Sequence, residues 1–123
     1  MIDLSISLTY IHLLLNRRSD DHAQLLLLGL TFLFRYYDVR KTSIYAEERQ
    51  ESHFNVARTY HMLGLSSHAS RYYTLVLNEA SNSDHELLRE DLTTDAAYNL
   101  QTIYAMVGNV ELAKAVTDRW LVL

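Results

Sequence analysis

The side chains that could carry out chemistry are three histidines and one short polar run. His53, His61 and His68 lie near one another in the sequence. His61 and His68 flank a predicted turn, so a metal ion there would need further ligands. The run SDDH, Ser19 to His22, combines a nucleophile, acids and a base. It stands at a predicted helix start, where capping of backbone N–H groups explains it better.

The composition excludes sites that need cysteine or a glycine-rich loop. The chain has no cysteine, so it can form neither a disulfide framework nor a thiolate zinc site. It also has no glycine-rich phosphate loop. We therefore expect no catalytic residue, no metal site and no cofactor, and hence no enzyme.

Length and charge favour one compact domain that binds neither nucleic acid nor membrane. The chain has 123 residues, of which 49% are hydrophobic, enough for one core. Its formal net charge is −4, and its eleven Lys and Arg residues are dispersed, so it lacks the basic face that phosphate binding needs. The apolar run 25–34 is too short to cross a bilayer, which takes roughly 20 residues. The segment 1–15 lacks the basic start and cleavage site of a signal peptide.

The elements that must position any site are helices. The chain has no proline and no persistent strand-like alternation. Polar residues that can cap helix starts are Asp20 or Asp21, Ser66 or Ser67, and Asn109. Ser83 with Glu86 three residues on fits a capping box for a short extra turn. We expect six main helices, at about 2–15, 22–41, 43–63, 66–78, 92–107 and 110–121.

Two of the three glycines divide this helical pattern into hairpins. Gly64 and Gly108 each follow a helix and stand directly before the next one. Glycine takes a positive φ at such a helix end without steric cost. Aligned on their glycines, the two stretches share three positions: Asn55/Asn99, Tyr60/Tyr104 and Ala69/Ala113. We expect the tyrosines to fill the space between hairpins, and the alanines to allow the two helices of each hairpin to approach closely.

This is the pattern of the tetratricopeptide repeat (TPR). We predict an all-α fold of antiparallel helical hairpins, stacked as a TPR-like right-handed superhelix. The expected segments of this single domain are a degenerate hairpin at 1–41, a repeat at 43–78, an insertion at 79–91 and a repeat at 92–123. Four residues depart from the pattern: His53 and Ala97 replace tryptophan, Ser81 replaces a proline, and Trp120 replaces an alanine. We expect Trp120 to change the packing distance of the last helix or to face a partner.

Two blocks carry a more specific resemblance, RQESHFNVARTYHMLGL at 49–65 and DAAYNLQTIYAMVGN at 95–109. With their surroundings they resemble the C-terminal part of the large TPR-bearing subunit of RNA polymerase III general transcription factor IIIC. The resemblance covers nearly the whole chain. It implies a nuclear scaffold that helps to hold this factor together on tRNA genes and to place factor IIIB. It also implies protein partners among the subunits of factors IIIC and IIIB.

In a TPR stack the first helix of each hairpin lines a concave groove, and residues four apart share that face. The candidate partner-binding residues are therefore Phe54, Arg58, Met62, Tyr98, Thr102 and Met106. They include the aromatic, Met and Arg side chains that interface cores favour. Such a face binds protein, so a scaffold of the transcription factor IIIC type is the first hypothesis.

Two other hypotheses belong to different classes. One is a generic TPR adaptor for a peptide of another complex; its co-chaperone form is disfavoured because Phe54 and Arg58 replace residues of the Lys and Asn clamp for a carboxylate. The other is a small helical enzyme or a nucleic-acid binder, which the missing catalytic constellation and the dispersed basic residues disfavour.

Overall fold

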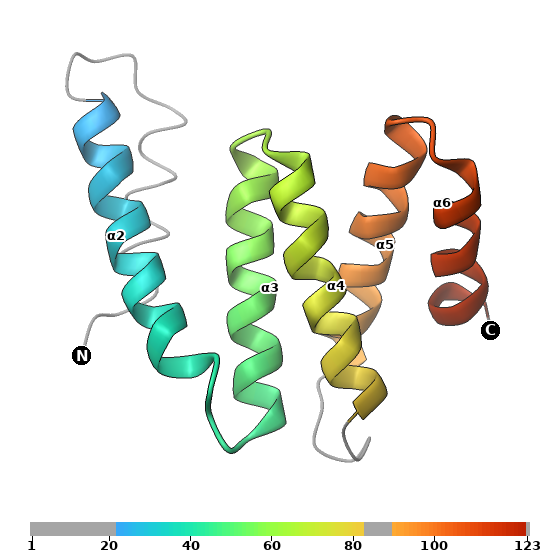
Figure 1. Ribbon diagram of the computed structural model, residues 1–123, viewed down its shortest axis with the longest axis horizontal. Helices are drawn as coiled ribbons and strands as arrows, with labels where there is room; N and C mark the ends of the chain where they lie inside the picture. The colour runs from blue at the N-terminus through green and yellow to red at the C-terminus, as the bar shows by residue number, and fades with distance from the viewer. Residues whose placement is uncertain (1–21, 83–89, 123) are drawn as a thin grey trace.

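The computed structural model describes residues 22–82 and 90–122, which form antiparallel helices standing side by side (Figure 1). The helices are α2 (His22–Arg40), α3 (Ala46–Met62), α4 (Ser66–Asn82), α5 (Glu90–Met106) and α6 (Val110–Val116), and α6 continues into a π-helical turn (Thr117–Leu121). No strand occurs in these two ranges. The predicted all-α fold of stacked TPR-like hairpins is confirmed, and the handedness of the superhelix stays a prediction. The predicted helix 2–15, the caps at Asp20 or Asp21 and the Ser83–Glu86 capping box lie outside the described residues.

The two predicted glycines close two equivalent turns. Gly64 has φ +77° and Gly108 has φ +82°, so both adopt the left-handed conformation expected of them. Leu65 N–H donates to the carbonyl of Tyr60 at 2.9 Å, and Asn109 N–H donates to the carbonyl of Tyr104 at 2.8 Å. These bonds satisfy carbonyls that a helix end leaves free. α3 therefore pairs with α4, and α5 with α6, through the same backbone geometry.

Small residues allow these helices to pack closely. Ala69 of α4 is fully buried and Ala113 of α6 is nearly so, as the hairpin pattern predicted. Tyr60 packs against both apolar clusters of the core, and Tyr104 packs against the larger one. The larger cluster joins α3, α4 and α5, and the smaller one joins α2 to α3. α3 is therefore covered on several sides, and its residues from Ser52 to Ala57 are all buried.

The start of α3 and the end of α4 differ from the prediction. α3 begins at Ala46 rather than at 43, because the Ser43 hydroxyl accepts Tyr45 N–H at 3.1 Å within a turn that precedes the helix. α4 continues to Asn82 rather than ending near 78, because Ser81 replaces the proline that would stop it. α4 and α5 thus occupy both ends of the range 79–91 that was predicted as an insertion. The division of the chain into domain segments stays a prediction.

The last predicted helix changes its geometry before Trp120. The segment 117–121 forms a π-helical turn instead of continuing the α-helix. Trp120 is partly buried against the larger apolar cluster, and the Arg119 guanidinium carbon lies 5.0 Å from the centre of its ring. Arg119 also donates to the Ser81 hydroxyl of α4 at 2.9 Å. The wider turn therefore accommodates a bulky side chain where the repeat pattern has an alanine.

No helix in the two described ranges is long and apolar enough to cross a membrane.

Candidate functional site

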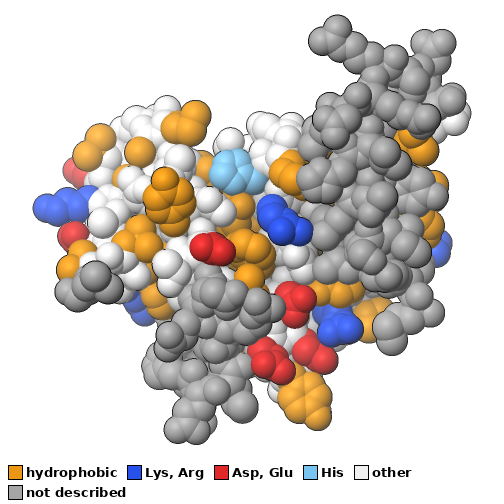
Figure 2. Space-filling model, turned by 180° about the vertical axis from the view of Figure 1, so that it is seen from behind, with side chains coloured by type: hydrophobic (Ala, Val, Ile, Leu, Met, Phe, Trp, Pro, Cys, Tyr) orange, Lys and Arg blue, Asp and Glu red, His pale blue; other side chains and the backbone are white. Residues whose placement is uncertain are grey.

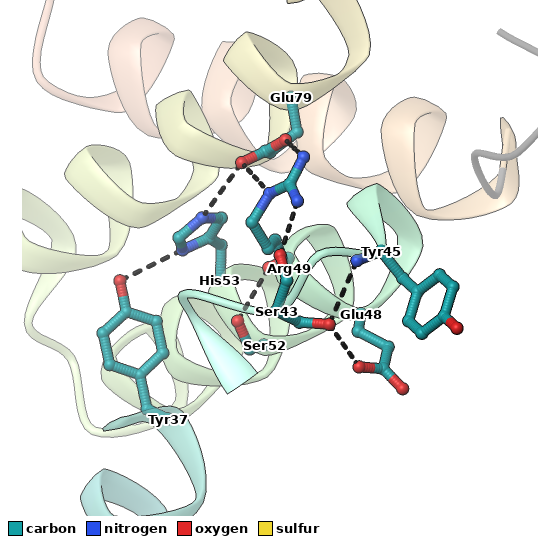
Figure 3. Close-up of polar contacts among 8 residues, drawn as sticks. All are labelled: Tyr37, Ser43, Tyr45, Glu48, Arg49, Ser52, His53 and Glu79. Carbon is teal, nitrogen blue, oxygen red and sulfur yellow. Dashed lines mark hydrogen bonds and ion pairs between the residues drawn. The ribbon is translucent and has the colours of Figure 1, made fainter. Parts of the chain in front are cut away.

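A polar network ties α2, α3 and α4 together beside the smaller apolar cluster (Figure 3). Arg49 of α3 forms a two-bond ion pair with Glu79 of α4, with Nε to Oε1 at 3.0 Å and Nη2 to Oε2 at 3.2 Å. His53 lies between Glu79 and Tyr37 of α2: its Nδ1 is 3.1 Å from the Tyr37 hydroxyl, and its Nε2 is 3.8 Å from Glu79 Oε1. The network therefore fixes how α2 and α4 sit on the two sides of α3.

Burial keeps His53 neutral. Desolvation lowers its pKa below the ordinary value of 6.5, and the Glu79 carboxylate opposes this only in part. A neutral imidazole satisfies both neighbours. Its Nδ1 accepts a hydrogen bond from the Tyr37 hydroxyl, and its Nε2 carries a proton that faces Glu79. Burial also raises the pKa of Tyr37, to about 12, so its hydroxyl stays protonated and can donate.

This network was not predicted. The available signal was His53, a polar residue where the repeat pattern has tryptophan. A second signal was Glu79, which stands three residues after the apolar Val76 and so shares one side of the predicted helix with it. A charged residue in that position needs a partner, and Arg49 supplies it.

A second polar centre lies where α3, α4 and α5 meet. Tyr73 of α4 is fully buried, and its hydroxyl accepts Asn99 Nδ2 of α5 at 3.2 Å. The same hydroxyl lies 3.1 Å from Nδ1 of His61 on α3. Burial raises the pKa of Tyr73 to about 12, while the charges of Arg58 and Asp95 act on it in opposite directions. Residues of α3 and α5 are thus held around one hydroxyl group of α4.

The contact between Asn99 and Tyr73 has a counterpart one hairpin earlier. Asn55 of α3 points its amide nitrogen at the Tyr36 hydroxyl of α2, at a distance of 3.5 Å. Asn55 and Asn99 are equivalent when the two hairpins are aligned on their glycines. The shared asparagine therefore joins the first helix of one hairpin to the preceding helix.

α3 and α5 present an open face next to this centre. Tyr98 is 62% exposed and Met106 is 82% exposed, and Arg58 is exposed as well. Thr102 is half-buried, and its hydroxyl donates to the Tyr98 carbonyl at 2.9 Å. In the view from behind (Figure 2), apolar, basic, acidic and histidine side chains lie together across the middle of the molecule. We call Arg58, Tyr98, Thr102 and Met106 the α3–α5 face.

Two of the six predicted groove residues lie elsewhere. Phe54 is only 7% exposed, and its ring centre lies 6.0 Å from that of Tyr73 inside the larger cluster. The prediction that Phe54 faces a partner is wrong, because α4 and α5 cover this part of α3. Met62 is half-buried and packs toward α2 against the smaller cluster. Whether the remaining residues bind a partner stays a prediction.

The three histidines are not brought together. His53 faces Tyr37, His61 faces Tyr73, and the His68 ring centre lies 5.1 Å from that of Tyr60. Within 22–82 and 90–122, no three histidine or acidic side chains group as a metal site would require.

No protein-family model matches the chain. It is similar over nearly its whole length to parts of three curated proteins. It is 35% identical over 98% of its length to "Transcription factor tau subunit sfc4" of Schizosaccharomyces pombe, and 37% identical over 98% to "Transcription factor tau 131 kDa subunit" of Saccharomyces cerevisiae. It is 36% identical over 89% of its length to "General transcription factor 3C polypeptide 3" of Homo sapiens. The chain spans 13%, 11% and 12% of the lengths of these three relatives.

Proposed function

We propose that this chain, whose relatives are subunits of transcription factor IIIC, is a protein–protein interaction segment of such a subunit and supports RNA polymerase III transcription of tRNA genes. The resemblance that the two sequence blocks indicated is confirmed, because all three curated relatives belong to that factor. The proposed partners are other protein subunits of factor IIIC or IIIB, and the proposed location is the nucleus. The same proposal gives the chain no catalytic role and no direct contact with nucleic acid or membrane.

The observation that carries the proposal is the composition of the α3–α5 face. Tyr98 and Met106 leave most of their surface in water, although the fold has a core that could have buried such side chains. Arg58 of α3 is exposed as well. Tyr and Arg are the residue types that most often dominate the binding energy of protein interfaces.

Rigidity of the face supports the same proposal. The Tyr73 hydroxyl binds Asn99 directly beside Tyr98, and it also contacts His61, three residues after Arg58. The side chains of Arg58 and Tyr98 thus project from backbone that these hydrogen bonds already hold in place. A partner then loses less free energy in ordering the interface, because little remains to be ordered.

The test compares a charge reversal on the face with a matched change elsewhere. Immobilised chain would be incubated with nuclear extract, and the bound proteins identified by mass spectrometry. Arg58→Glu combined with Tyr98→Ala is expected to lose the factor IIIC or IIIB subunits that the wild type retains. A truncation at a hot spot costs about 2 kcal/mol or more, which corresponds to a roughly 30-fold weaker Kd.

The control is Arg71→Glu combined with Leu112→Ala. Arg71→Glu makes the same charge change on an exposed residue of α4, and Leu112→Ala removes an exposed apolar side chain from α6. Circular dichroism would establish that both double variants keep their helices. Retention of every partner at wild-type affinity by the folded Arg58/Tyr98 variant would contradict the proposal.

A further inference from the structure

The connection between α2 and α3 exposes more apolar surface than a short turn requires. Val39, at the end of α2, is 70% exposed; Ile44 and Tyr45, directly before α3, are 85% and 59% exposed. Single exposed apolar residues are ordinary on protein surfaces, but three large ones within seven residues form a patch. This patch lies at the end of the helices where α2 passes into α3 (Figure 1).

Side-chain hydrogen bonds hold this turn in one conformation. The Ser43 hydroxyl accepts Tyr45 N–H at 3.1 Å and donates to the Glu48 carboxylate at 2.5 Å. The Ser43 carbonyl accepts Arg49 Nη1 at 2.6 Å. Arg49 is itself fixed by its ion pair with Glu79 of α4. The turn is therefore anchored directly to α3 and, through Arg49, to α4.

Tyr45 takes no part in these contacts through its ring. Figure 3 shows the Tyr45 ring pointing away from the network, while its backbone nitrogen faces Ser43. Ile44, beside it, is the most exposed large apolar residue in the described ranges. A rigid turn thus presents two large side chains to solvent, and such preorganisation lowers the entropic cost of binding.

The charges around the patch are unbalanced. Asp38 pairs with Lys41 at 3.0 Å, and Glu48 pairs with Arg40 at 3.4 Å. Glu47 and Glu51 stand four residues apart on α3, so they share one side of the helix. Within 22–82 and 90–122 neither of these two carboxylates has an ion-pair partner.

We propose that the α2–α3 turn surface, formed by Val39, Ile44, Tyr45, Glu47 and Glu51, docks a protein segment whose apolar side chains are flanked by lysine or arginine. The apolar residues of that segment cover Ile44 and Tyr45, and its basic residues meet Glu47 and Glu51. Complementary charge speeds encounter and suppresses wrong partners. The site is separate from the α3–α5 face and does not depend on the function proposed for that face.

The charges also argue against two other occupants. A symmetric contact with a second copy would place the same acidic patch on both sides, because a two-fold interface pairs a surface with itself. A nucleic acid would bring phosphates toward Glu47 and Glu51. A protein segment with basic and apolar residues brings no negative charge toward Glu47 and Glu51, so neither repulsion arises.

The probe for this proposal is a displayed library of random 16-residue peptides, selected on the wild-type chain. Before each round the library would be depleted on the double variant Ile44→Ser with Tyr45→Ser. We expect the surviving peptides to combine apolar residues with lysine or arginine. A synthetic copy of a selected peptide should bind the double variant at least about 10-fold more weakly than the wild type.

One further variant tests whether the acidic residues contribute to peptide binding, and another serves as a control at the α3–α5 face. Glu47→Lys with Glu51→Lys should weaken the same peptide by about 10-fold or more, and added salt should weaken its binding to the wild type. Arg58→Glu with Tyr98→Ala should leave this affinity unchanged, whatever it does to the partners of the α3–α5 face. Circular dichroism and urea unfolding would establish that each variant is folded.

Four results would overturn the proposal. The selection could return no enriched peptide, or acidic or uncharged ones. The peptide could bind the Ile44/Tyr45 variant as tightly as the wild type. Its binding could depend on the Arg58/Tyr98 pair instead, which would place the peptide on the other face. Sedimentation could also show a wild-type dimer that the Ile44/Tyr45 variant lacks, which would make a second copy the occupant.

Discussion

Replacing the turn glycines should destabilise the fold through the backbone alone. Gly64 and Gly108 have φ of +77° and +82°, a region that side chains with a Cβ adopt at a cost. Apart from the two adjacent residues, a Cβ added at either position would meet no atom within 4 Å. A substitution therefore adds conformational strain without a steric clash, and its cost can be worked from the backbone term.

The expected cost of alanine is about 1–2 kcal/mol at each glycine, the typical penalty of the left-handed conformation for an L-residue. Valine should cost more than alanine, and more than about 1 kcal/mol in any case, because a β-branched side chain resists positive φ further. Asparagine should cost less than alanine, because its side chain can hydrogen-bond locally in this conformation. Gly64 and Gly108 lie in different hairpins, so the two alanine effects should add.

The assay is urea unfolding followed by circular dichroism. With a slope of about 2 kcal/mol per molar urea, a loss of 1 kcal/mol lowers the midpoint by about 0.5 M. The diagnostic result is that destabilisation increases in the order asparagine, alanine, valine. This order follows the preference of each residue for positive φ and not the size or polarity of its side chain. Equal midpoints for all variants would refute the reasoning. An alanine cost well above about 2 kcal/mol would refute it too, because it would require a contact in the open space beside the glycine.

Three other changes test the core. Ala69→Leu and Ala113→Leu should each lower the free energy of unfolding by about 1–3 kcal/mol through overpacking; unchanged urea midpoints would mean that the hairpin helices do not approach closely there. Phe54→Ala should cost about 3–5 kcal/mol, because the ring is buried; a cost under 1 kcal/mol in the same assay would place it at the surface instead. Since the pKa of His53 is lowered in the folded chain, the unfolded chain binds more protons below the ordinary pKa of about 6.5. Stability should thus be complete above that pH and fall as the pH drops below it, and His53→Gln should flatten this part of the profile measured by thermal unfolding.

The α3–α5 face was predictable in part. Periodicity of four placed Arg58, Tyr98 and Met106 on the first helix of each hairpin, and all three are exposed. The same periodicity placed Phe54 there, but Phe54 is buried. Helical spacing says which residues share a side of a helix; it does not say how far the neighbouring helices extend over that side.

The sequence singles out His53 and Glu79 as unusual polar residues, but it could not say which side chains they pair with across the helices. Arg49 and Glu79 are 30 residues apart and form an ion pair only because α4 lies along α3. The shared asparagines were visible as a repeat, but their tyrosine partners stand 19 and 26 residues away, at unequal spacing. The connections between successive hairpins differ in length, so an alignment of the two hairpins does not reveal which tyrosine each asparagine contacts.

What the sequence determined by itself is local. The positive φ at Gly64 and Gly108, the Asn109 cap that accepts Leu112 N–H at 3.2 Å, and the all-helical class each depend on a few neighbouring residues. What only the tertiary structure decided is which surfaces remain free. α4 and α5 cover Phe54, whereas the anchored turn before α3 leaves Ile44 and Tyr45 in solvent. The physical reason is that backbone preference is set within one turn of chain, while burial is set by helices that meet from distant parts of it.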